Sequence, residues 1–180
     1  MPQLTTPRLH CVPLQPADWP FFLALQQDRA VMRFVADGRT ESEIRDAFTA
    51  RLQPWSPGDS HWLCLLVRDA VSGQPLGVTG YVHREPDVAE VGFLFAPQAQ
   101  GKGYGLESLR AVCEFAWQEG GIRRLTASVT AGNVPSRRVL EKCGFVLEGE
   151  LRDSYWLHGG WHNDWLFGAL RREWPGPSGE

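Results

Sequence analysis

The hydrophobic pattern along the chain predicts seven strands and four helices. Runs of alternating or consecutive apolar residues, separated by turn residues, predict strands at 8–14, 61–69, 75–85, 88–97, 123–130, 145–157 and 163–173. Apolar residues spaced by three and four positions, with capping residues and glycines at the ends, predict helices at 16–28, about 40–52, 103–118 and 133–144. The elements therefore follow the order β-α-α-β-β-β-α-β-α-β-β.

The connections between these elements indicate the fold class. Short turn signals separate the three runs between residues 61 and 97, so these runs predict an antiparallel meander. A helix joins the strand at 88–97 to the strand at 123–130, which predicts a right-handed crossover between two parallel strands. We therefore expect a single α/β (α+β) domain over residues 1–174. It should have a mixed sheet with helices on both faces and a disordered tail at 175–180.

The composition excludes several classes of protein. The chain has 180 residues, a net charge of −3, 43% hydrophobic residues and 22% charged residues, a globular rather than a disordered composition. The acidic balance argues against nucleic acid as a partner, because binding phosphates needs a basic surface. No apolar run approaches the roughly 20 residues of a membrane span, and the first residues do not resemble a secretory signal. We expect a cytoplasmic protein with no membrane partner.

The cysteines and histidines do not follow a metal-binding pattern. The cysteines are Cys11, Cys64, Cys113 and Cys143. Their spacing is irregular and contains no C-x-x-C, which favours reduced thiols over a disulfide framework or a zinc site. His158 and His162 flank a Gly-Gly-Trp turn without an evident third ligand. We therefore expect no metal.

The segment 100–105, Gln-Gly-Lys-Gly-Tyr-Gly, carries three alternate glycines between a predicted strand and a predicted helix. Glycines there let the backbone adopt positive φ and approach a ligand closely. Successive N–H groups, with the positive end of the helix behind them, suit a pyrophosphate. A glycine-rich turn is not specific by itself. The Walker pattern fails because Lys102 is not followed by Ser or Thr, and the dinucleotide-binding pattern fails because its third glycine is absent.

The same segment resembles the acetyl-coenzyme A loop of the GCN5-related N-acetyltransferases (GNAT), which reads Gln/Arg-x-x-Gly-x-Gly/Ala. Residues 100–105 fit this motif at every fixed position. The segment 133–145 and the opening Thr-x-Arg-Leu at 6–9 resemble the RimJ/RimL-like branch of ribosomal-protein N-terminal acetyltransferases. The resemblance covers about residues 5–172. It implies the GNAT fold, a mostly antiparallel twisted sheet of about seven strands, flanked by helices, with a splayed parallel strand pair that holds the cofactor.

The resemblance also implies which residues bind acetyl-CoA. Backbone groups of the strand 93–95 should pair with the pantetheine arm as an added β-strand would. The loop should hold the pyrophosphate, and the helix that begins near Asn133 should contact the pantetheine. The implied cofactor-binding residues are Phe93, Leu94, Phe95, Gln100, Gly101, Lys102, Gly103, Tyr104, Gly105, Asn133, Ser136 and Arg138.

Two side chains are implied to be catalytic. Glu90 matches a family position that often holds a general base, commonly acting through water; its plain alternative is an exposed strand carboxylate. Many family members have a Tyr acid four residues before the Gly-Phe pair, but Leu140 stands at that position here. Ser136 is then the candidate acid that protonates the leaving thiolate. Its plain alternative is a solvent-facing serine beside an Asn133 N-cap.

The implied function is direct transfer of an acetyl group from acetyl-CoA to a primary amine. By resemblance to the branch, the acceptor is an α-amine of a protein N-terminus or an amino-acid-like molecule. The alternatives are a detoxifying acetyltransferase of a small-molecule amine and a coenzyme-A-binding regulator without turnover.

The acceptor groove should be built from the helices at 17–28 and 41–53 and the last hairpin. Residues 16–53 carry six acids and five arginines, so their charge favours no acceptor class. Several tryptophans in or beside loops could line an acceptor pocket: Trp55, Trp62, Trp156 and Trp161. We expect a small-molecule or peptide amine as partner, and a monomer or homodimer.

Overall fold

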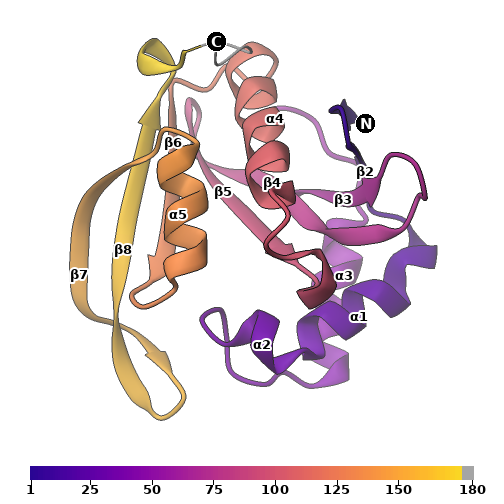
Figure 1. The fold of residues 1–180 in the computed structure, drawn as a ribbon, viewed down its shortest axis with the longest axis horizontal. Helices are drawn as coiled ribbons and strands as arrows, with labels where there is room; N and C mark the ends of the chain where they lie inside the picture. Colours follow the sequence, from indigo (N-terminus) through magenta and orange to yellow (C-terminus); the bar gives the residue numbers. More distant parts are fainter. Residues whose placement is uncertain (176–180) are drawn as a thin grey trace.

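The computed structural model describes residues 1–175, and these residues form an eight-stranded sheet with helices on both faces (Figure 1). The strands are β1 (Leu4–Thr5), β2 (Leu9–Pro13), β3 (Leu63–Asp69), β4 (Pro75–Glu85), β5 (Val88–Phe95), β6 (Arg124–Thr130), β7 (Val146–Leu157) and β8 (Gly160–Leu170). Their order in the sheet is β1-β2-β3-β4-β5-β6-β8-β7. All neighbours pair antiparallel except β5 and β6. This confirms the expected mixed, mostly antiparallel sheet, with one strand more than the predicted seven, because the two-residue β1 is too short to produce a periodic pattern.

The helices are α1 (Trp19–Gln27), α2 (Arg29–Met32), α3 (Glu41–Arg51), α4 (Tyr104–Gln118) and α5 (Val134–Lys142). Three single turns of 3-10 helix lie at Pro16–Asp18, Pro97–Ala99 and Arg171–Glu173. The helix predicted at 16–28 is present as a 3-10 turn followed by α1, but the prediction missed α2, because Asp28 is extended and begins this separate helix. The Asp28 carboxylate accepts hydrogen bonds from the N–H groups of Ala30 and Val31, which caps α2.

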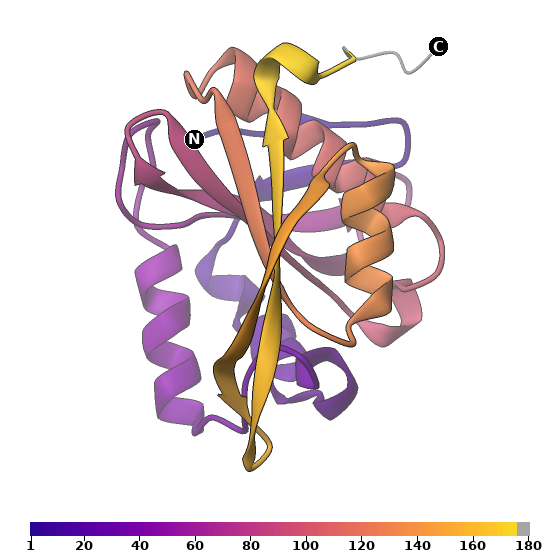
Figure 2. The same cartoon turned by 90° about the vertical axis from the view of Figure 1, so that its left-hand side faces the viewer.

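Each face of the sheet carries its own hydrophobic core. On one face, α1 and α3 bury Phe22, Ile44 and Phe48 against strand residues such as Leu66. On the other face, α4 and α5 bury a larger set, which includes Leu109, Val112, Leu140, Leu65 and Leu125. Figure 2 shows the sheet nearly edge-on, with α3 on one side and α5 on the other. The two cores hold the helices against both faces of the sheet, and the candidate site lies in the sheet between them.

The parallel pair β5–β6 separates after three residues. Pairing runs from Val88 opposite Arg124 to Glu90 opposite Thr126 and then stops, while β4 stays paired along β5 and β8 along β6. Figure 1 shows the two strands diverging from this point. The splayed pair implied by the resemblance is thus present, and its gap begins next to Glu90.

The hairpin β7–β8 reaches across to the segment that joins α2 to α3. Its turn residues His158 and Gly159 both have positive φ, 51° and 76°, as a type I′ hairpin turn requires. The Tyr155 hydroxyl donates to the Val35 carbonyl at 2.6 Å, and the His158 N–H donates to Asp37 Oδ1 at 2.9 Å. The hairpin therefore holds this connecting segment in place. The disordered tail predicted at 175–180 lies, beyond Pro175, outside the described residues.

Candidate functional site

The gap between β5 and β6 exposes backbone hydrogen-bonding groups in the middle of the sheet. The Ala96 N–H donates to the Leu76 carbonyl at 2.9 Å, so Ala96 faces β4. Because backbone groups alternate sides along a strand, Leu94 also faces β4, whereas Val91 and Phe93 face the gap. The Phe95 carbonyl faces the gap too, and Gln100 Nε2 donates to it at 3.0 Å. An extended ligand in the gap would thus find the C=O group of Val91 and the N–H and C=O groups of Phe93, because the Val91 N–H still belongs to the last bridge with β6.

The loop before α4 presents a second set of backbone donors. Gly101 and Gly103 have φ of +75° and +82°. Gly103 is the N-cap of α4 and has no side chain to cap the first turn, whose N–H groups have no acceptor within the helix. Gly105 differs from the sequence expectation. It lies inside α4, and a Cβ there would make ordinary contacts with Val139 at 3.7 Å, so neither positive φ nor close packing against the protein requires this glycine.

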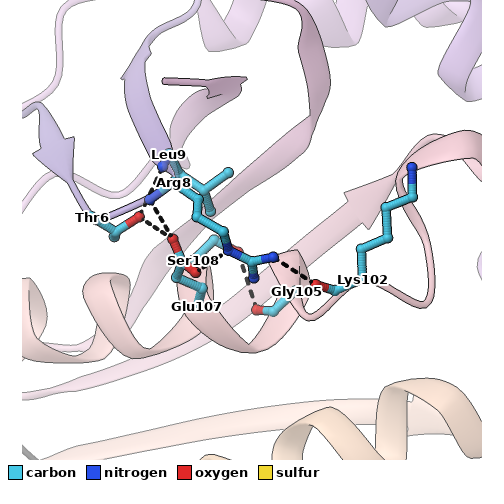
Figure 3. A network of polar contacts seen from close by, with 7 residues as sticks. All are labelled: Thr6, Arg8, Leu9, Lys102, Gly105, Glu107 and Ser108. Carbon is cyan, nitrogen blue, oxygen red and sulfur yellow. Dashed lines mark hydrogen bonds and ion pairs between the residues drawn. The ribbon is translucent and has the colours of Figure 1, made fainter. Parts of the chain in front are cut away.

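The segment 6–9, which precedes and begins β2, is bonded to this loop and to α4 (Figure 3). Glu107 accepts hydrogen bonds from the Thr6 hydroxyl, the Arg8 N–H at 3.1 Å and Arg8 Nε at 2.8 Å. Arg8 Nη1 donates to the Lys102 carbonyl at 2.9 Å, and its guanidinium lies over the Tyr104 ring. We call Thr6, Arg8 and Glu107 the clamp. It fixes the loop backbone from outside, while the Lys102 ammonium extends away from it.

Electrostatics favour an ionised carboxylate in the clamp. Partial burial by itself would raise the pKa of Glu107, but the hydrogen bonds from Thr6 and Arg8 and the charge of Arg8 outweigh it. The net effect holds the pKa of Glu107 below its ordinary value. The clamp therefore works with a charged acceptor at neutral pH.

A cavity of about 640 Å³ passes through the gap between β5 and β6. Side chains alternate faces along β5: Val91 and Phe95 belong to the core under α4 and α5, and Leu94 to the core under α1 and α3. Glu90 therefore faces α1 and α3, while Ser136 lines the cavity from α5 on the opposite face. The two candidate catalytic side chains lie on opposite faces of the sheet, at one opening.

On the α5 face, Asn133 and Ser136 have the predicted capping geometry. Asn133 Oδ1 accepts from the Ser136 N–H at 3.4 Å, a long contact, and the Ser136 hydroxyl has no hydrogen-bond partner within residues 1–175. Leu140, one turn further along, is buried in the cavity wall. Arg138 is exposed and lies outside the cavity lining. A half-buried hydroxyl free to turn toward a ligand is thus the polar group that α5 offers.

On the α1–α3 face, Glu90 is paired with a cation that the sequence reasoning did not single out. Arg84 donates to Glu90 Oε1 from Nε at 3.3 Å and from Nη2 at 3.2 Å, and the Glu90 side chain is 28% exposed. The Trp62 ring covers Gly92 so closely that a Cβ there would lie 3.1 Å from two ring carbons. An amine that reaches the gap from this face would pass Trp62 and meet Glu90.

The structure groups most of the predicted site residues into two neighbouring places. Glu90, Phe93, Leu94, Asn133 and Ser136 line the cavity. Phe95 follows these residues at the end of β5, and its carbonyl is hydrogen-bonded to the Gln100 side chain, which begins the loop. The remaining loop residues lie at the N-terminus of α4. Arg138 lies in neither place. Sequence reasoning noted Thr6 and Arg8 only as part of a family-like segment, and it missed Arg84 and Glu107. Their contacts join separate elements, and no spacing along the chain encodes them.

The predicted acceptor groove and the tryptophans have mixed outcomes. Residues of α1, α3 and the hairpin do line the cavity, among them Phe22, Arg51 and Tyr155. Of the loop tryptophans only Trp62 lines it. Trp55 is buried in the core, since its indole N–H donates to the His61 carbonyl and its ring packs against Tyr81. Trp156 and Trp161 stack edge to face on the exposed hairpin tip.

Among residues 1–175, no group of three or more His, Cys, Asp or Glu side chains is arranged to hold a metal ion. None of the helices in this part of the chain combines the length and the apolar character needed to cross a membrane. The four cysteines are buried and unpaired.

Comparison with known proteins gives consistent matches. A family model described as "Acetyltransferase (GNAT) domain" matches residues 8–146. The chain is 26% identical over 171 residues to the uncharacterized N-acetyltransferase YnaD of Bacillus subtilis, covering 95% of this chain and 98% of that protein.

Two solved structures share the fold at low identity. Spermidine N-acetyltransferase of Vibrio cholerae, in complex with CoA and spermine, superposes with a TM-score of 0.81 at 19% identity, over 93% and 98% of the two chains. The RimL ribosomal L7/L12 α-N-protein acetyltransferase in complex with coenzyme A gives 0.79 at 19% identity, over 94% and 98%.

Proposed function

Because the chain belongs to the GNAT acetyltransferase family, we propose that it transfers an acetyl group from acetyl-CoA directly to an α-amine. The acceptor is a protein N-terminus or an amino-acid-like molecule. The observation that carries this proposal is the cavity through the gap, with Ser136 on one face of the sheet and Glu90 on the other. An acyl donor and an amine can approach such an opening from opposite sides and meet without a covalent enzyme intermediate.

The residues present fit acetyl-CoA. The amides of a pantetheine arm match the unpaired backbone groups that residues 93–95 turn toward the gap, as strand addition requires. The uncapped first turn of α4 and the two left-handed glycines, Gly101 and Gly103, suit a pyrophosphate. When bound, acetyl-CoA supplies an activated thioester; the chain's own groups bind it, orient it and move protons.

Glu90 is positioned to take the proton from the attacking amine, directly or through water. An α-amine with a pKa of about 7.7–8.0 is roughly a tenth to a sixth neutral at pH 7, whereas a lysine-type amine with a pKa of about 10.4 is almost entirely protonated. A carboxylate already paired with Arg84 suits the easier task. This supports an α-amine as the acceptor.

Ser136 is positioned to donate its hydroxyl proton to the leaving thiolate, and the Phe93 N–H can stabilise negative charge on the thioester oxygen. Both groups line the cavity. Leu140 supplies no hydroxyl at the family's usual acid position, so Ser136 is the candidate acid among the cavity-lining residues of α5.

A second candidate function is detoxifying acetylation of a small-molecule amine. The observation that favours it is the aromatic lining on the α1–α3 side, where Phe22, Phe34 and Trp62 face the cavity. Such a lining suits a compact hydrophobic amine as well as the first residue of a peptide.

The test is an acceptor panel with acetyl-CoA, with free thiol as the readout. Peptide amides, free amino acids, polyamines and hydrophobic small amines are compared at equal concentration, and acetylated products are identified by mass. We expect the highest kcat/KM among α-amines. Binding of acetyl-CoA without thiol release for any amine would contradict an acetyltransferase, and preference for a small amine lacking peptide character would favour the second function.

A further inference from the structure

The charged side chains of the cavity give its acceptor side a positive balance. Five charged residues of the described chain line the cavity: Arg39, Arg51, Arg84, Glu90 and Asp164. Arg84 and Glu90 are paired with each other. Within residues 1–175, Arg39 and Arg51 have no carboxylate within ion-pair distance. Asp164 is the remaining acid, and it accepts a hydrogen bond from the Ser154 hydroxyl at 2.9 Å.

Arg51 is the unpaired cation that is better placed to meet a ligand. It is the last residue of α3 and half-buried, whereas Arg39 is exposed at the other end of that helix. Its one hydrogen bond in the described chain runs from Nη1 to the Ala47 carbonyl of its own helix at 3.2 Å, which leaves other guanidinium donors free. Its charge reaches the cavity wall: burial raises the pKa of Cys64 to about 11, and Arg51 opposes that rise.

An unpartnered polar atom on the same side of the sheet also points to a polar ligand. The side-chain oxygen of Gln26, on α1, is buried and has no hydrogen-bond partner within residues 1–175, and Gln26 lines the cavity. Buried polar groups are costly when unpaired, so a ligand that supplies hydrogen bonds is favoured over a purely apolar one.

Building on the proposed function, we infer that the acceptor amine carries a carboxylate or another anionic group on the same small scaffold, and that Arg51 binds this anion. A polyamine would bring further positive charge into a lining in which arginines already outnumber acids, a mismatch that costs affinity. An anion-bearing amine matches the lining.

The experiment compares three dipeptide amides with a shared first residue: Phe-Asp and Phe-Asn, which have the same shape and differ in charge, and Phe-Lys, which carries the opposite charge. Their α-amines are alike, so differences in kcat/KM report on the second side chain. We expect Phe-Asp to exceed Phe-Asn by about tenfold, mainly through KM, and Phe-Lys to be poorest. The advantage of Phe-Asp should shrink as salt is raised, because added ions screen the attraction.

Variants then assign the preference to one residue. Arg51→Gln should bring the Phe-Asp to Phe-Asn ratio close to one, and Arg51→Lys should restore part of the ratio. Arg45→Gln is the matched control, since Arg45 lies on the same helix but packs over Trp19 outside the cavity lining. It should keep the wild-type ratio.

A readout without turnover separates this inference from the proposed function. The acetylated products of the three peptides are titrated calorimetrically into the coenzyme A complex, and their dissociation constants should follow the same order. Equal or better use of Phe-Lys or spermidine, or a ratio unchanged in a folded Arg51→Gln variant, would overturn the anionic acceptor while the acetyltransferase stands. If Arg51→Gln does not fold, the wild-type order and its salt dependence decide. Absence of turnover with every amine would count against the proposed function, and the calorimetric order would still decide the charge preference.

Discussion

Glu107→Gln tests whether the clamp sets the geometry of the cofactor loop. The carboxylate accepts three hydrogen bonds, from the Thr6 hydroxyl and from the N–H and Nε of Arg8. Bonds to a charged group contribute about 1.5–3 kcal/mol each when shielded. Arg8 is 46% exposed, so its ion pair contributes at the low end, about 0.5–1 kcal/mol. Glutamine keeps one acceptor oxygen but turns an NH₂ group toward the remaining donors.

These contributions predict a loss of about 1–2 kcal/mol in the free energy of unfolding. For a chain of this length the melting temperature should fall by about 3–6 °C. The effect on cofactor binding follows from the fraction of molecules in which the loop has the conformation that binds coenzyme A. If about 1 kcal/mol of its ordering is lost, the apparent Kd for coenzyme A rises about fivefold. Calorimetric titration gives the Kd, and thermal melts give the stability.

The control is Glu114→Gln on the same helix, since Glu114 makes no hydrogen bond within the described chain. If Glu107→Gln keeps the wild-type Kd for coenzyme A but has a lower melting temperature, the clamp does not position the loop. Its hydrogen bonds then contribute to the stability of the fold alone. The pH dependence supplies a second check. A lowered folded-state pKa means that the stabilisation is present above the ordinary Glu value of 4.5 and is lost as pH falls through the folded value. Wild-type stability should therefore fall more steeply than that of Glu107→Gln below about pH 4.5.

Four further predictions concern the cofactor and the chemistry. Acetyl-CoA at a hundred times its Kd should stabilise the fold by about 2.7 kcal/mol. If millimolar acetyl-CoA does not raise the melting temperature, the cofactor assignment is wrong. Gly103→Val should abolish the binding of acetyl-CoA in titrations, because φ is +82° and a Cβ would lie 3.2 Å from the Arg8 guanidinium. The control is Gly73→Val, which has φ of +73° in a remote turn with open space; it should have the same backbone strain but still bind acetyl-CoA. Wild-type affinity of Gly103→Val for acetyl-CoA would show that the loop does not bind the pyrophosphate. Ser136→Ala should lower kcat by up to about 10²-fold with little change in cofactor Kd, whereas loss of binding would make Ser136 a pantetheine contact. The cost of Glu90→Gln in kcat should shrink as pH rises toward the pKa of the acceptor amine, and a cost that is constant with pH would contradict the base role.

Local signals were sufficient for most of the fold. Strands such as 75–85 and helices such as 103–118 combine periodic apolar residues with turn or capping residues at their ends, and the structure places β4 and α4 within a residue of these bounds. Two elements escaped prediction. β1 has two residues and α2 has four, so each spans only about one hydrophobic period and shows no repeat. β1 depends on its pairing with β2, and α2 depends on the cap at Asp28.

The site was accessible only in part, for a related reason. The motif at 100–105 and the pair Asn133 and Ser136 are contiguous in sequence, so a resemblance can locate them. The ion pair of Arg84 with Glu90 crosses a hairpin, and the contact of Arg8 with Glu107 joins residues 99 apart. Pairs of this kind follow from how strands and helices pack. In the sequence, the charged residues that form them look the same as charged residues exposed to solvent.

The gap between β5 and β6 has a consequence for how the protein exchanges its amide hydrogens. Central strands usually exchange most slowly with deuterated solvent, because their hydrogen bonds open only when the whole domain unfolds. Here the amide of Phe93 lies in the middle of an eight-stranded sheet with no neighbouring strand on one side. It should take up deuterium rapidly in the free protein and slowly once a ligand completes the ladder. A peptide covering 88–95 is therefore a built-in reporter of occupancy, readable by mass spectrometry before the acceptor amine is identified.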